Sequence, residues 1–427
     1  MIKIYNINEI DEKDILIRTQ SKPGVEGIVH DIIEDVRANG DAALRKYAGK
    51  FDGAVIDEIE VSPDEIESAM SEVEPEFIEI LKEAAENIRE FHSHQVRNSF
   101  VINKEDGVVL GQKVMPLERV GLYIPGGTAS YPSSVLMNCI PAKIAGVRQI
   151  VMTTPTGKDG KISPNILAAA KIAGVDKVYK TGGAQAVAAL CFGTETIKPV
   201  DKIVGPGNVF VAEAKRQVYG FVDIDMIAGP SEILIIAEDE NNPAHLAADM
   251  LSQAEHDRLA SAVLVTDSAD LAKAVSDELE KQIPLLPRSG IARESIDKNG
   301  KIILTDDLKA SIAVANKIAP EHLEVCVDNP FDYLSEIRNA GSVFLGKNCP
   351  EALGDYFAGP NHTLPTSGTA RFSSPLSVDD FVKKSAFTYY TKEALSKVNR
   401  QIAYFAEKEG LSAHARSALI RTENIYE

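Results

Sequence analysis

Residues 149–183, QIVMTTPTGKDGKISPNILAAAKIAGVDKVYKTGG, decide the fold class of this chain. The short apolar runs at 149–155 and 176–183 are typical of buried strands, and the Ala-rich segment 165–174 between them favours a helix. A strand, a helix and a second strand in this order predict two parallel strands joined by a crossover helix, because parallel neighbours need a long connection.

The same alternation continues on both sides of this stretch. A first series places strands at 120–125, 149–155, 176–183, 201–208 and 231–237. A second series begins with a helix at 243–257 and places strands at 261–266, 301–305, 322–327 and 341–346. The chain is therefore predicted to be α/β, with two α/β units in tandem and parallel sheets covered on both faces.

The flanking regions have a different character. Residues 24–98 are acidic and predicted to be helical, and the stretch SPDE at 62–65 predicts a helix start with a capping box. Residues 359–377 are rich in Gly, Pro, Ser and Thr, which favours a long functional loop or a linker. Residues 377–427 are predicted to form a mostly helical tail with little sheet character.

Composition excludes several classes of function. The 427 residues include 45 Lys and Arg against 63 Asp and Glu, a formal charge of −18 without a long basic run, so we expect no nucleic-acid partner. Residues 1–20 lack the features of a secretory or transit peptide, and no apolar run could span a membrane, so we expect a cytoplasmic protein. No CxxC pair is present, so reduced core thiols are expected for Cys139, Cys191, Cys326 and Cys349.

The stretch APEHLEV at 319–325 places a carboxylate and an imidazole side by side, at Glu321 and His322. A solvated turn explains such a pair, but an acid/base pair for catalysis is the alternative of greater consequence. The stretch reads as a helix-to-strand junction, whereas ligands in open α/β sheets gather at the carboxyl ends of strands.

Four further side chains could hold a metal ion. Gln253 and His256 stand three apart in a predicted helix and so share one face, although unrelated surface residues often have this spacing. Asp355 lies near the irregular loop, and His414 lies in the tail, where a solvated helix end is the simpler explanation. Together they offer two nitrogens and two oxygens, a set that zinc accepts.

Glycine clusters follow several predicted strands. They are YIPGG (123–127), TGGAQA (181–186), VGPGN (204–208) and AGPSE (228–232). Such turns let a phosphate approach main-chain N–H groups near a helix N-terminus. No GxGxxG fingerprint is present, so ordinary turns at the sheet edge explain any single cluster better.

Taken together, these stretches resemble the histidinol dehydrogenase family over residues 115–420. The resemblance rests on RVGLYIPGG, GGAQAVAAL, VDKIVGPGN, AGPSE, MLSQAEH, PEHLE, AGSVFLG, GDYFAGPNHTLPT and GLSAHARS, in that order. It implies a zinc-dependent, NAD-linked oxidation of L-histidinol through L-histidinal to L-histidine. It also implies two incomplete Rossmann-like domains with a helical N-terminal segment and a helical C-terminal tail, in an intertwined homodimer whose subunits share active sites.

The resemblance assigns roles residue by residue. Glu321 and His322 match the catalytic pair: His322 takes the alcohol proton and Glu321 activates water. The matching zinc ligands are Gln253, His256, Asp355 and His414, which together with His322 also contact substrate. Further substrate contacts match Ser231, His362 and Glu409, and NAD contacts match Tyr123, Gln185 and Asn208.

Domain limits follow from both readings. We expect an N-terminal arm at 1–23, a discontinuous first α/β domain at 24–119 with 238–376, a second, NAD-binding α/β domain at 120–237, and the helical tail at 377–427. Two alternatives stay open on the residues alone. One is a zinc hydrolase in which Glu321 activates metal-bound water without NAD, and the other is a catalytically silent α/β binding protein.

Overall fold

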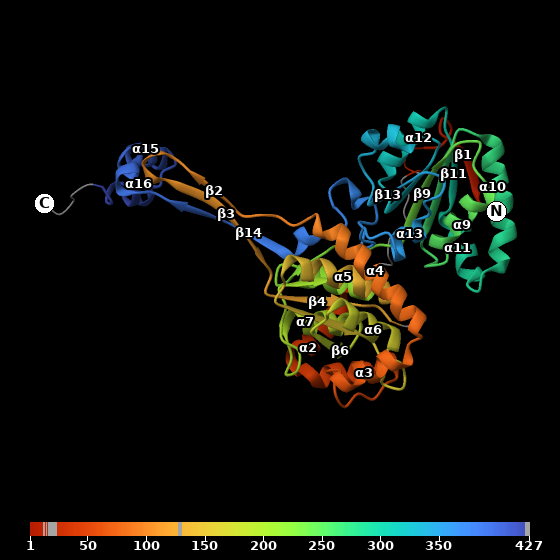
Figure 1. Cartoon of the computed structure of the whole chain (residues 1–427), viewed down its shortest axis with the longest axis horizontal. Coiled ribbons are helices and arrows are strands. Elements are labelled where there is room, and N and C mark those ends of the chain that lie inside the picture. Colours follow the sequence, from red (N-terminus) through yellow and green to blue (C-terminus); the bar gives the residue numbers. More distant parts are fainter. Residues whose placement is uncertain (12, 14, 16–23, 127–129, 423–427) are drawn as a thin grey trace. The chain divides into compact units, whose positions relative to one another are not determined.

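A computed structural model describes residues 1–11, 13, 15, 24–126 and 130–422 of the chain. The chain divides into two compact units. Unit 1 comprises Met1–Gln95 and Leu117–Phe381, and unit 2 comprises Val96–Pro116 and Val382–Glu427. The predicted α/β class is confirmed, because both large sheets of unit 1 are parallel and carry helices (Figure 1).

The first series of strands forms a five-stranded parallel sheet, here called sheet B, in the order β6-β5-β4-β7-β8. Its strands are β4 (Arg119–Tyr123), β5 (Gln149–Thr154), β6 (Lys177–Lys180), β7 (Lys202–Val204) and β8 (Asp223–Ile224). Its crossover helices are α5 (Pro132–Ala145), α6 (Pro164–Ala173), α7 (Gly183–Phe192) and α8 (Val209–Val218). The strand order reverses between β4 and β7, and ligands of open α/β sheets usually bind at the carboxyl ends of the strands at such a reversal.

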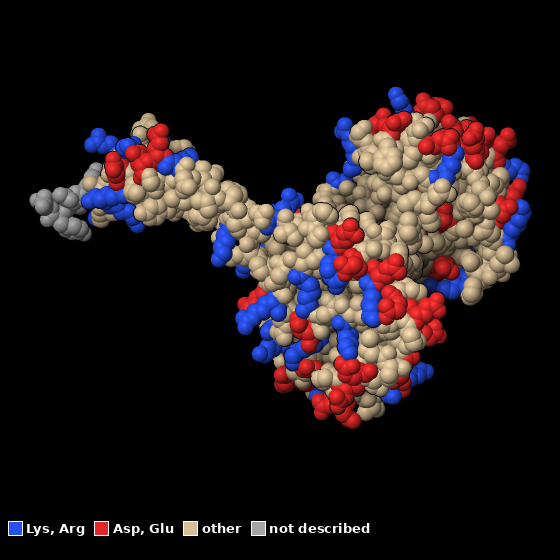
Figure 2. All heavy atoms as spheres, in the orientation of Figure 1, with Lys and Arg blue, Asp and Glu red and all other residues tan. Residues whose placement is uncertain are grey.

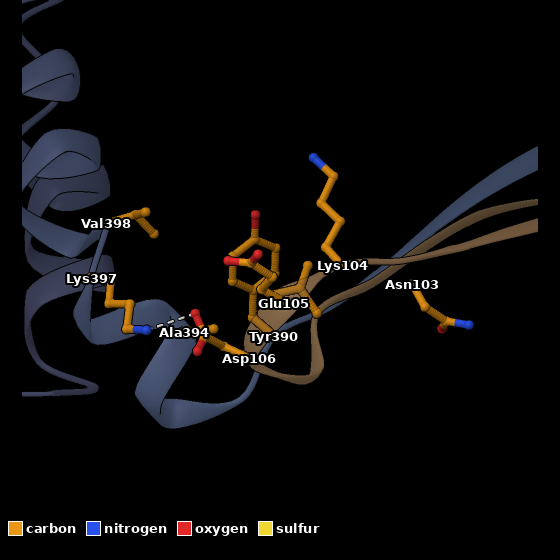
Figure 3. Close-up of a pocket in the computed structure, with 9 residues that line it drawn as sticks. Asn103, Lys104, Glu105, Asp106, Tyr390, Ala394, Lys397 and Val398 are labelled. Atoms are coloured by element: carbon orange, nitrogen blue, oxygen red, sulfur yellow. Dashed lines mark hydrogen bonds and ion pairs between the residues drawn. The ribbon is translucent and has the colours of Figure 1, made fainter.

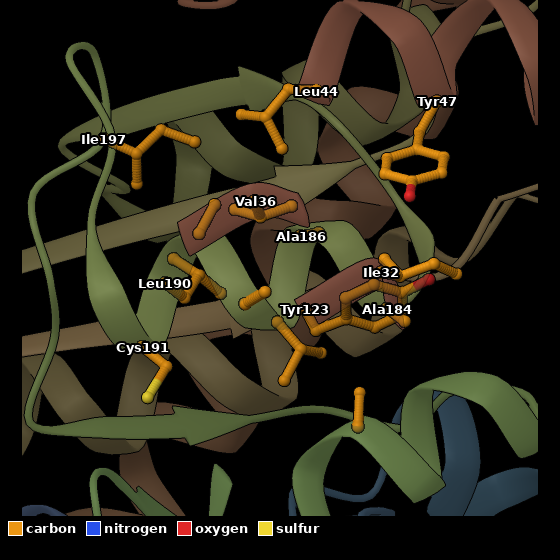
Figure 4. Close-up of a cluster of buried hydrophobic side chains, with 14 of the residues drawn as sticks. Ile32, Val36, Leu44, Tyr47, Tyr123, Ala184, Ala186, Leu190, Cys191 and Ile197 are labelled. Carbon is orange, nitrogen blue, oxygen red and sulfur yellow. The ribbon is translucent and has the colours of Figure 1, made fainter. Parts of the chain in front are cut away.

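The N-terminal helices pack on this sheet, which corrects one predicted grouping. They are α2 (Glu26–Tyr47), α3 (Pro63–Glu72) and α4 (Pro75–Ser93). Val36 and Leu44 of α2 share a core with Leu190 of α7 (Figure 4), and α4 packs against α5. Placing residues 24–119 with 238–376 was therefore wrong for these helices, because their apolar stripes are buried by the helices of sheet B. The capping box at 62–65 is confirmed.

The second series forms a six-stranded parallel sheet, sheet A, in the order β1-β11-β10-β9-β12-β13. Its strands are β1 (Lys3–Asn6), β9 (Glu232–Ala237), β10 (Ser261–Thr266), β11 (Lys301–Leu304), β12 (His322–Cys326) and β13 (Ser342–Leu345). Its helices are α9 (Pro243–Ala254), α10 (Ala269–Gln282), α11 (Ser289–Asn299), α12 (Leu308–Ile318) and the short α13 (Glu351–Tyr356).

Two strands of sheet A were assigned elsewhere. β9 pairs with β10 and β12, so the predicted domain limit at residue 237 falls after a strand that belongs to the other sheet. β1, predicted as part of an arm, pairs with β11. Both pairings join segments far apart in the chain, which local patterns do not reveal. The rest of the predicted arm lies largely outside the described residues.

Unit 2 combines an antiparallel sheet with helices. β14 (Val382–Tyr389) pairs with β3 (Val109–Pro116), which pairs with β2 (Phe100–Asn103). The tail is helical as predicted in α14 (Lys392–Ser396), α15 (Asn399–Lys408) and α16 (Ser412–Leu419), but its predicted lack of sheet character is wrong at β14. The residues of β14 are nearly all exposed, so no apolar alternation marked the strand. Among the described helices, none has the length and apolar character needed to cross a bilayer.

Candidate active site

The paired residues Glu321 and His322 lie at the amino edge of sheet A. Ala319 adopts φ 50° where it caps α12, and β12 begins at His322, in register with Ile233 of β9 and Ser342 of β13. The strand order of sheet A reverses between β9 and β12, so the pair sits at the reversal. The site is thus built at the strand edge opposite to the one where open α/β sheets usually bind ligands.

His322 is held in one orientation. Its side chain is 4% exposed, and Nδ1 donates a hydrogen bond to the main-chain oxygen of Glu232 at 3.0 Å. Nε2 has no hydrogen-bond partner and lies 3.5 Å from Oδ1 of Asp355 and 4.0 Å from Oε1 of Glu351. The carbonyl contact fixes a proton on Nδ1 and points Nε2 toward the carboxylates of Asp355 and Glu351.

Glu321 is buried beside this imidazole. Its Oε2 accepts a hydrogen bond from the main-chain N–H of Glu232 at 2.9 Å and lies 3.7 Å from Nδ1 of His322. The same residue of β9, Glu232, therefore holds both members of the pair, one through its N–H and the other through its carbonyl. This arrangement fixes their relative positions without using a second side chain.

Burial and charge shift the pKa values of the group. Burial raises the pKa of Glu321 to about 8, although His322 opposes the shift. Burial acts to lower the pKa of His322, but the carboxylates of Glu321, Asp355 and Glu351 outweigh it and raise that pKa to about 10. Burial acts to raise the pKa of Asp355, but contacts with His322 and His362 lower it well below its usual range. The carboxylates therefore favour a positive charge among them.

Helix α13 supplies Asp355 and Glu351 and positions His362 after it. Nδ1 of His362 donates to the main-chain oxygen of Asp355 at 2.9 Å, and Nε2 lies 3.3 Å from Oγ of Ser134 on α5. Burial lowers the pKa of His362 despite the nearby Asp355 carboxylate. His362, a residue of the irregular loop, therefore hydrogen-bonds both to α13, next to sheet A, and to α5, next to sheet B.

The end of α9 brings Gln253 and His256 to the same place. The helix ends at Ala254, three residues before the predicted end, but the N–H of His256 donates to the carbonyl of Gln253 at 3.1 Å. Gln253 is 1% exposed, and its Nε2 has no partner. Burial lowers the pKa of His256, while the charge of Asp355 acts on it in the opposite direction.

The remaining substrate candidates separate into two groups. Ser231 directly precedes β9, and its carbonyl accepts a hydrogen bond from the N–H of Ser261 at 2.9 Å. It therefore lies at the same amino edge as Glu321 and His322. Glu409 and His414 belong to unit 2, at the end of α15 and in α16, where both are exposed.

The three residues matched to NAD contacts lie at the carboxyl edge of sheet B. Tyr123 ends β4, and its hydroxyl accepts a hydrogen bond from the N–H of Gly183 at 3.0 Å. Gln185 on α7 is buried, with Oε1 unpartnered. Asn208 follows β7 and caps α8 by accepting hydrogen bonds from the N–H groups of Phe210 and Val211. Tyr123 and Asn208 flank the reversal of strand order, where dinucleotides bind in doubly wound sheets.

Glu351 and Glu232 were missed in the sequence. Glu351 stands four residues before Asp355 on one helix, a spacing that puts two carboxylates on one face and could have drawn attention to it. Ser252 of α9 donates to Oε2 of Glu351 at 2.8 Å and so joins the two helices of the site. Glu232 contacts the pair through its main-chain N–H and carbonyl, which every residue except proline has, so the sequence could not single it out.

The donor atoms fit a bound metal ion. One donor atom from each of His322, Glu351 and Asp355 lies within 4.8 Å of the others, and of these three only Asp355 is among the predicted ligands. Gln253 follows Ser252, which contacts Glu351, and the nitrogen of its buried amide is unpartnered; turning that amide exchanges its nitrogen for an oxygen donor. Carboxylate oxygens and imidazole nitrogens are donors that zinc accepts.

A separate hollow of about 770 Å³ lies in unit 2 (Figure 3). It is wide open and is lined by residues of the β2–β3 connection and by α14, with an ion pair between Lys397 and Asp106 at 2.7 Å. No histidine or cysteine lines it. Its chemistry therefore offers neither the acid/base pair nor the metal donors found in unit 1.

Comparisons with known proteins identify the family of the chain. A model of the histidinol dehydrogenase family matches residues 17–422. A histidinol dehydrogenase of Clostridium acetobutylicum is 59% identical over 426 residues, 99% of each chain, and one of Listeria monocytogenes is 54% identical over 417 residues, 98% of this chain and 97% of the relative. The crystal structure of histidinol dehydrogenase from Elizabethkingia anophelis matches with a TM-score of 0.94 at 40% identity, covering 100% of this chain and 99% of that one.

Two parallel sheets with an enclosed acid–base cluster at the edge of one of them define an α/β enzyme. The sequence relationships make that enzyme an oxidoreductase of histidine biosynthesis. The chain belongs to the histidinol dehydrogenase family, which confirms the resemblance in its motifs.

Proposed function

We propose that the chain catalyses the zinc-dependent, NAD-linked oxidation of L-histidinol through L-histidinal to L-histidine, in the cytoplasm. The observation that carries the proposal is the enclosed pair Glu321 and His322, held by Glu232 and facing Asp355 across 3.5 Å. An acid/base pair next to metal donors suits a reaction that moves protons at a bound alcohol.

Gln253, His256 and Asp355, with His414, would hold the zinc. When bound, zinc would anchor the amine and imidazole nitrogens of histidinol and offset the surrounding carboxylate charge. Support comes from the unpartnered buried amide of Gln253 and from the carboxylates around Asp355. His322 and Glu351 lie against the same donors, so their charges would respond to occupation of the site.

Tyr123, Gln185 and Asn208 would bind NAD, which accepts the hydride. Support comes from their common position at the carboxyl edge of sheet B and from the unpartnered Oε1 of Gln185, a buried acceptor. The glycine turn that precedes Asn208 also brings main-chain groups near a helix N-terminus, as phosphate binding requires.

His322 would serve as the general base for both oxidations. Its Nδ1 stays on the carbonyl of Glu232, so Nε2 is the atom that takes the alcohol proton while hydride leaves the carbon. The carboxylates that raise the pKa of this imidazole would have their charge offset by bound zinc, so the step starts from the neutral ring. The product of the first step is an aldehyde.

Glu321 would act in the second oxidation. An aldehyde must gain the oxygen of water before it can lose a second hydride, so a base has to take a proton from that water. A pKa near 8 makes the Glu321 carboxylate a stronger base than an ordinary glutamate. His322 then takes a proton from the hydrate as hydride leaves, and two NAD are reduced for each histidinol.

Glu409 and His414 would come from a partner subunit. The strands of unit 2 expose a row of large apolar side chains, and Figure 2 shows little charge on the visible face of these strands. Such a surface is expected to be covered by a second copy in an intertwined homodimer. The exposed members are Phe100, Val101, Ile102, Phe387 and Tyr389.

The test is to supply L-histidinol and NAD to metal-replete and chelator-treated protein and to follow NADH and histidine. Two NADH for each histidine, lost on chelation and restored by zinc, is the expected result. Turnover of histidinol without NAD, or full activity after verified metal removal, contradicts the proposal.

A further inference from the structure

A lysine is buried next to the turn that follows β7. The side chain of Lys215 on α8 is 2% exposed and that of Asp225 is 1% exposed, with Nζ and Oδ1 2.5 Å apart. Lysine is almost never buried without a partner. A buried ion pair is nevertheless poor evidence for stability, because removing both charges from water offsets their attraction. The pair therefore suggests a role other than stabilising the fold.

Lys215 and Asp225 both hydrogen-bond to one residue of this turn, Gly205. Nζ of Lys215 donates to the carbonyl of Gly205 at 2.6 Å, and Oδ2 of Asp225 accepts from the N–H of Gly205 at 2.7 Å. Both polar groups of Gly205 are thus occupied by the pair. Gly205 has φ 115°, and a Cβ there would overlap the main-chain oxygen of Tyr123, so only glycine fits between them.

The turn that contains Gly205 lies next to the residues proposed to bind NAD. Gly205 stands three residues before Asn208, and its other side abuts Tyr123. The hydroxyl of Tyr123 accepts from the N–H of Gly183, two residues before Gln185. Gly205 is therefore connected to all three proposed NAD contacts: to Tyr123 directly, to Gln185 through Tyr123 and Gly183, and to Asn208 along the chain.

The substrate side is held by different contacts. The carbonyl of Ser231 is fixed by the N–H of Ser261, and Glu321 and His322 are both fixed by the main chain of Glu232. Between the two sides, the N–H of Gly229 donates to Oγ1 of Thr366 at 2.6 Å. Loosening the turn at Gly205 should therefore leave the acid/base pair in place.

We propose that Lys215 and Asp225 are positioning residues that hold the carboxyl edge of sheet B in the shape that binds NAD. The inference rests on the proposed NAD-linked reaction. Neither residue is assigned to contact the dinucleotide; each acts through the main chain of Gly205 on the turn that carries Asn208. Their loss should weaken NAD binding selectively.

The test compares the double variant Lys215→Met/Asp225→Asn, which removes both charges at similar volume, with Lys202→Met. Lys202 is also buried and ion-paired, with Asp223 at 3.1 Å and Asp380 at 3.3 Å, but it lies at the opposite end of β7. All measurements use the purified, zinc-loaded full-length protein. They are the NAD affinity by calorimetry, the KM values for NAD and histidinol, kcat and the melting temperature.

We expect NAD binding and the KM for NAD to weaken by about tenfold in the double variant, the scale of one or two lost positioning hydrogen bonds. The KM for histidinol should stay within about twofold in the double variant, and Lys202→Met should keep its NAD affinity. Unchanged NAD affinity in the double variant overturns the inference. So does a parallel loss for NAD and histidinol, or an equal loss in Lys202→Met, since either result shows a merely structural role.

Failure of the proposed function and failure of this inference give different results. If the unsubstituted protein neither binds NAD nor forms NADH, the proposed function fails and the inference falls with it. If it does both while the double variant binds NAD normally, only the inference fails. Asp225→Asn alone removes one charge and keeps the side-chain shape, and it replaces the double variant, with the same outcomes, if that variant does not fold.

Discussion

Nδ1 of His322 donates to the main-chain oxygen of Glu232 at 3.0 Å, and the N–H of the same Glu232 donates to Glu321 at 2.9 Å. One residue of β9 thus orients both members of the acid/base pair, Glu321 just before β12 and His322 at its start. Adjacent parallel strands give this contact a fixed register, His322 opposite Ile233. The pair is therefore as rigid as the centre of sheet A, and substitutions in it should affect chemistry more than folding.

Substitution of the pair should separate the two oxidations. Glu321→Gln keeps a buried oxygen that can accept the N–H of Glu232 but removes the base, so histidinol oxidation should persist while histidinal oxidation slows by about 10²–10⁴-fold. His322→Ala should slow both steps by a similar factor. Single-turnover assays with histidinol and with histidinal measure each step. Equal, slight effects of both substitutions would contradict the assigned roles.

Substitution of His256 should release the metal. We expect His256→Ala to weaken zinc binding by at least about tenfold, because even residues one shell beyond a ligand have effects of this size. His245→Ala is the matched control, since His245 lies on α9, the helix that directly precedes His256, and is exposed. Zinc content after dialysis against a graded chelator measures the difference. Equal retention in both variants would remove His256 from the metal site.

Two inactive variants should restore activity when combined. If His414 completes the site of a partner, a dimer of one His322→Ala and one His414→Ala subunit contains one intact site of two, so the purified mixed dimer should have about half of the unsubstituted activity. Co-expression with two affinity tags and a rate assay on the mixed dimer test this. Absence of any recovery in a purified mixed dimer means that each chain completes its own site.

Asp52 should make stability depend on pH away from the site. Burial raises the pKa of Asp52 to about 6 from its usual value of 3.8, so the folded chain holds this proton more tightly than the unfolded chain. The resulting destabilisation is fully present above pH 6 and disappears as the pH falls toward 3.8. Because solvent screens this partly exposed carboxylate, Asp52→Asn should stabilise the protein by only about 1 kcal/mol at pH 8 and by less at pH 5.

Denaturant melts at the two pH values measure this effect. Asp57→Asn is the control, because Asp57 is exposed nearby and its substitution also removes one negative charge from a chain of formal charge −18. An equal gain from both substitutions would indicate relief of general charge repulsion. A gain from Asp52→Asn that grows as the pH is lowered would contradict the sign of the shift.

Local patterns in the sequence predicted most elements of unit 1. The predicted strand at 261–266 coincides with β10, and the one at 149–155 extends only one residue beyond β5. These strands are buried on both faces, so their apolar runs are short and unambiguous. β14 was missed because its side chains are largely exposed and its partner, β3, lies more than 250 residues earlier in the chain.

The candidate site was predicted through motifs rather than geometry. Glu321 and His322 are adjacent in sequence, so their pairing needs no folding model, whereas Glu351 enters only because α13 packs near His322 across the end of the sheet. The position of this site at the amino edge of sheet A also depends on β12 beginning at His322. A shift of the strand start by a few residues would move the pair along the strand, and sequence patterns do not fix strand ends that finely.

By itself, the sequence determined the α/β class, the order of strands and helices, the family and the residue types available for chemistry, because each depends on short-range periodicity or on motifs along the chain. The tertiary structure decided that the N-terminal helices cover sheet B, that β1 and β9 belong to sheet A, and that Glu232 orients the acid/base pair. These features arise from contacts between segments far apart in sequence, where the burial of apolar faces and the pairing of main-chain groups choose the partner.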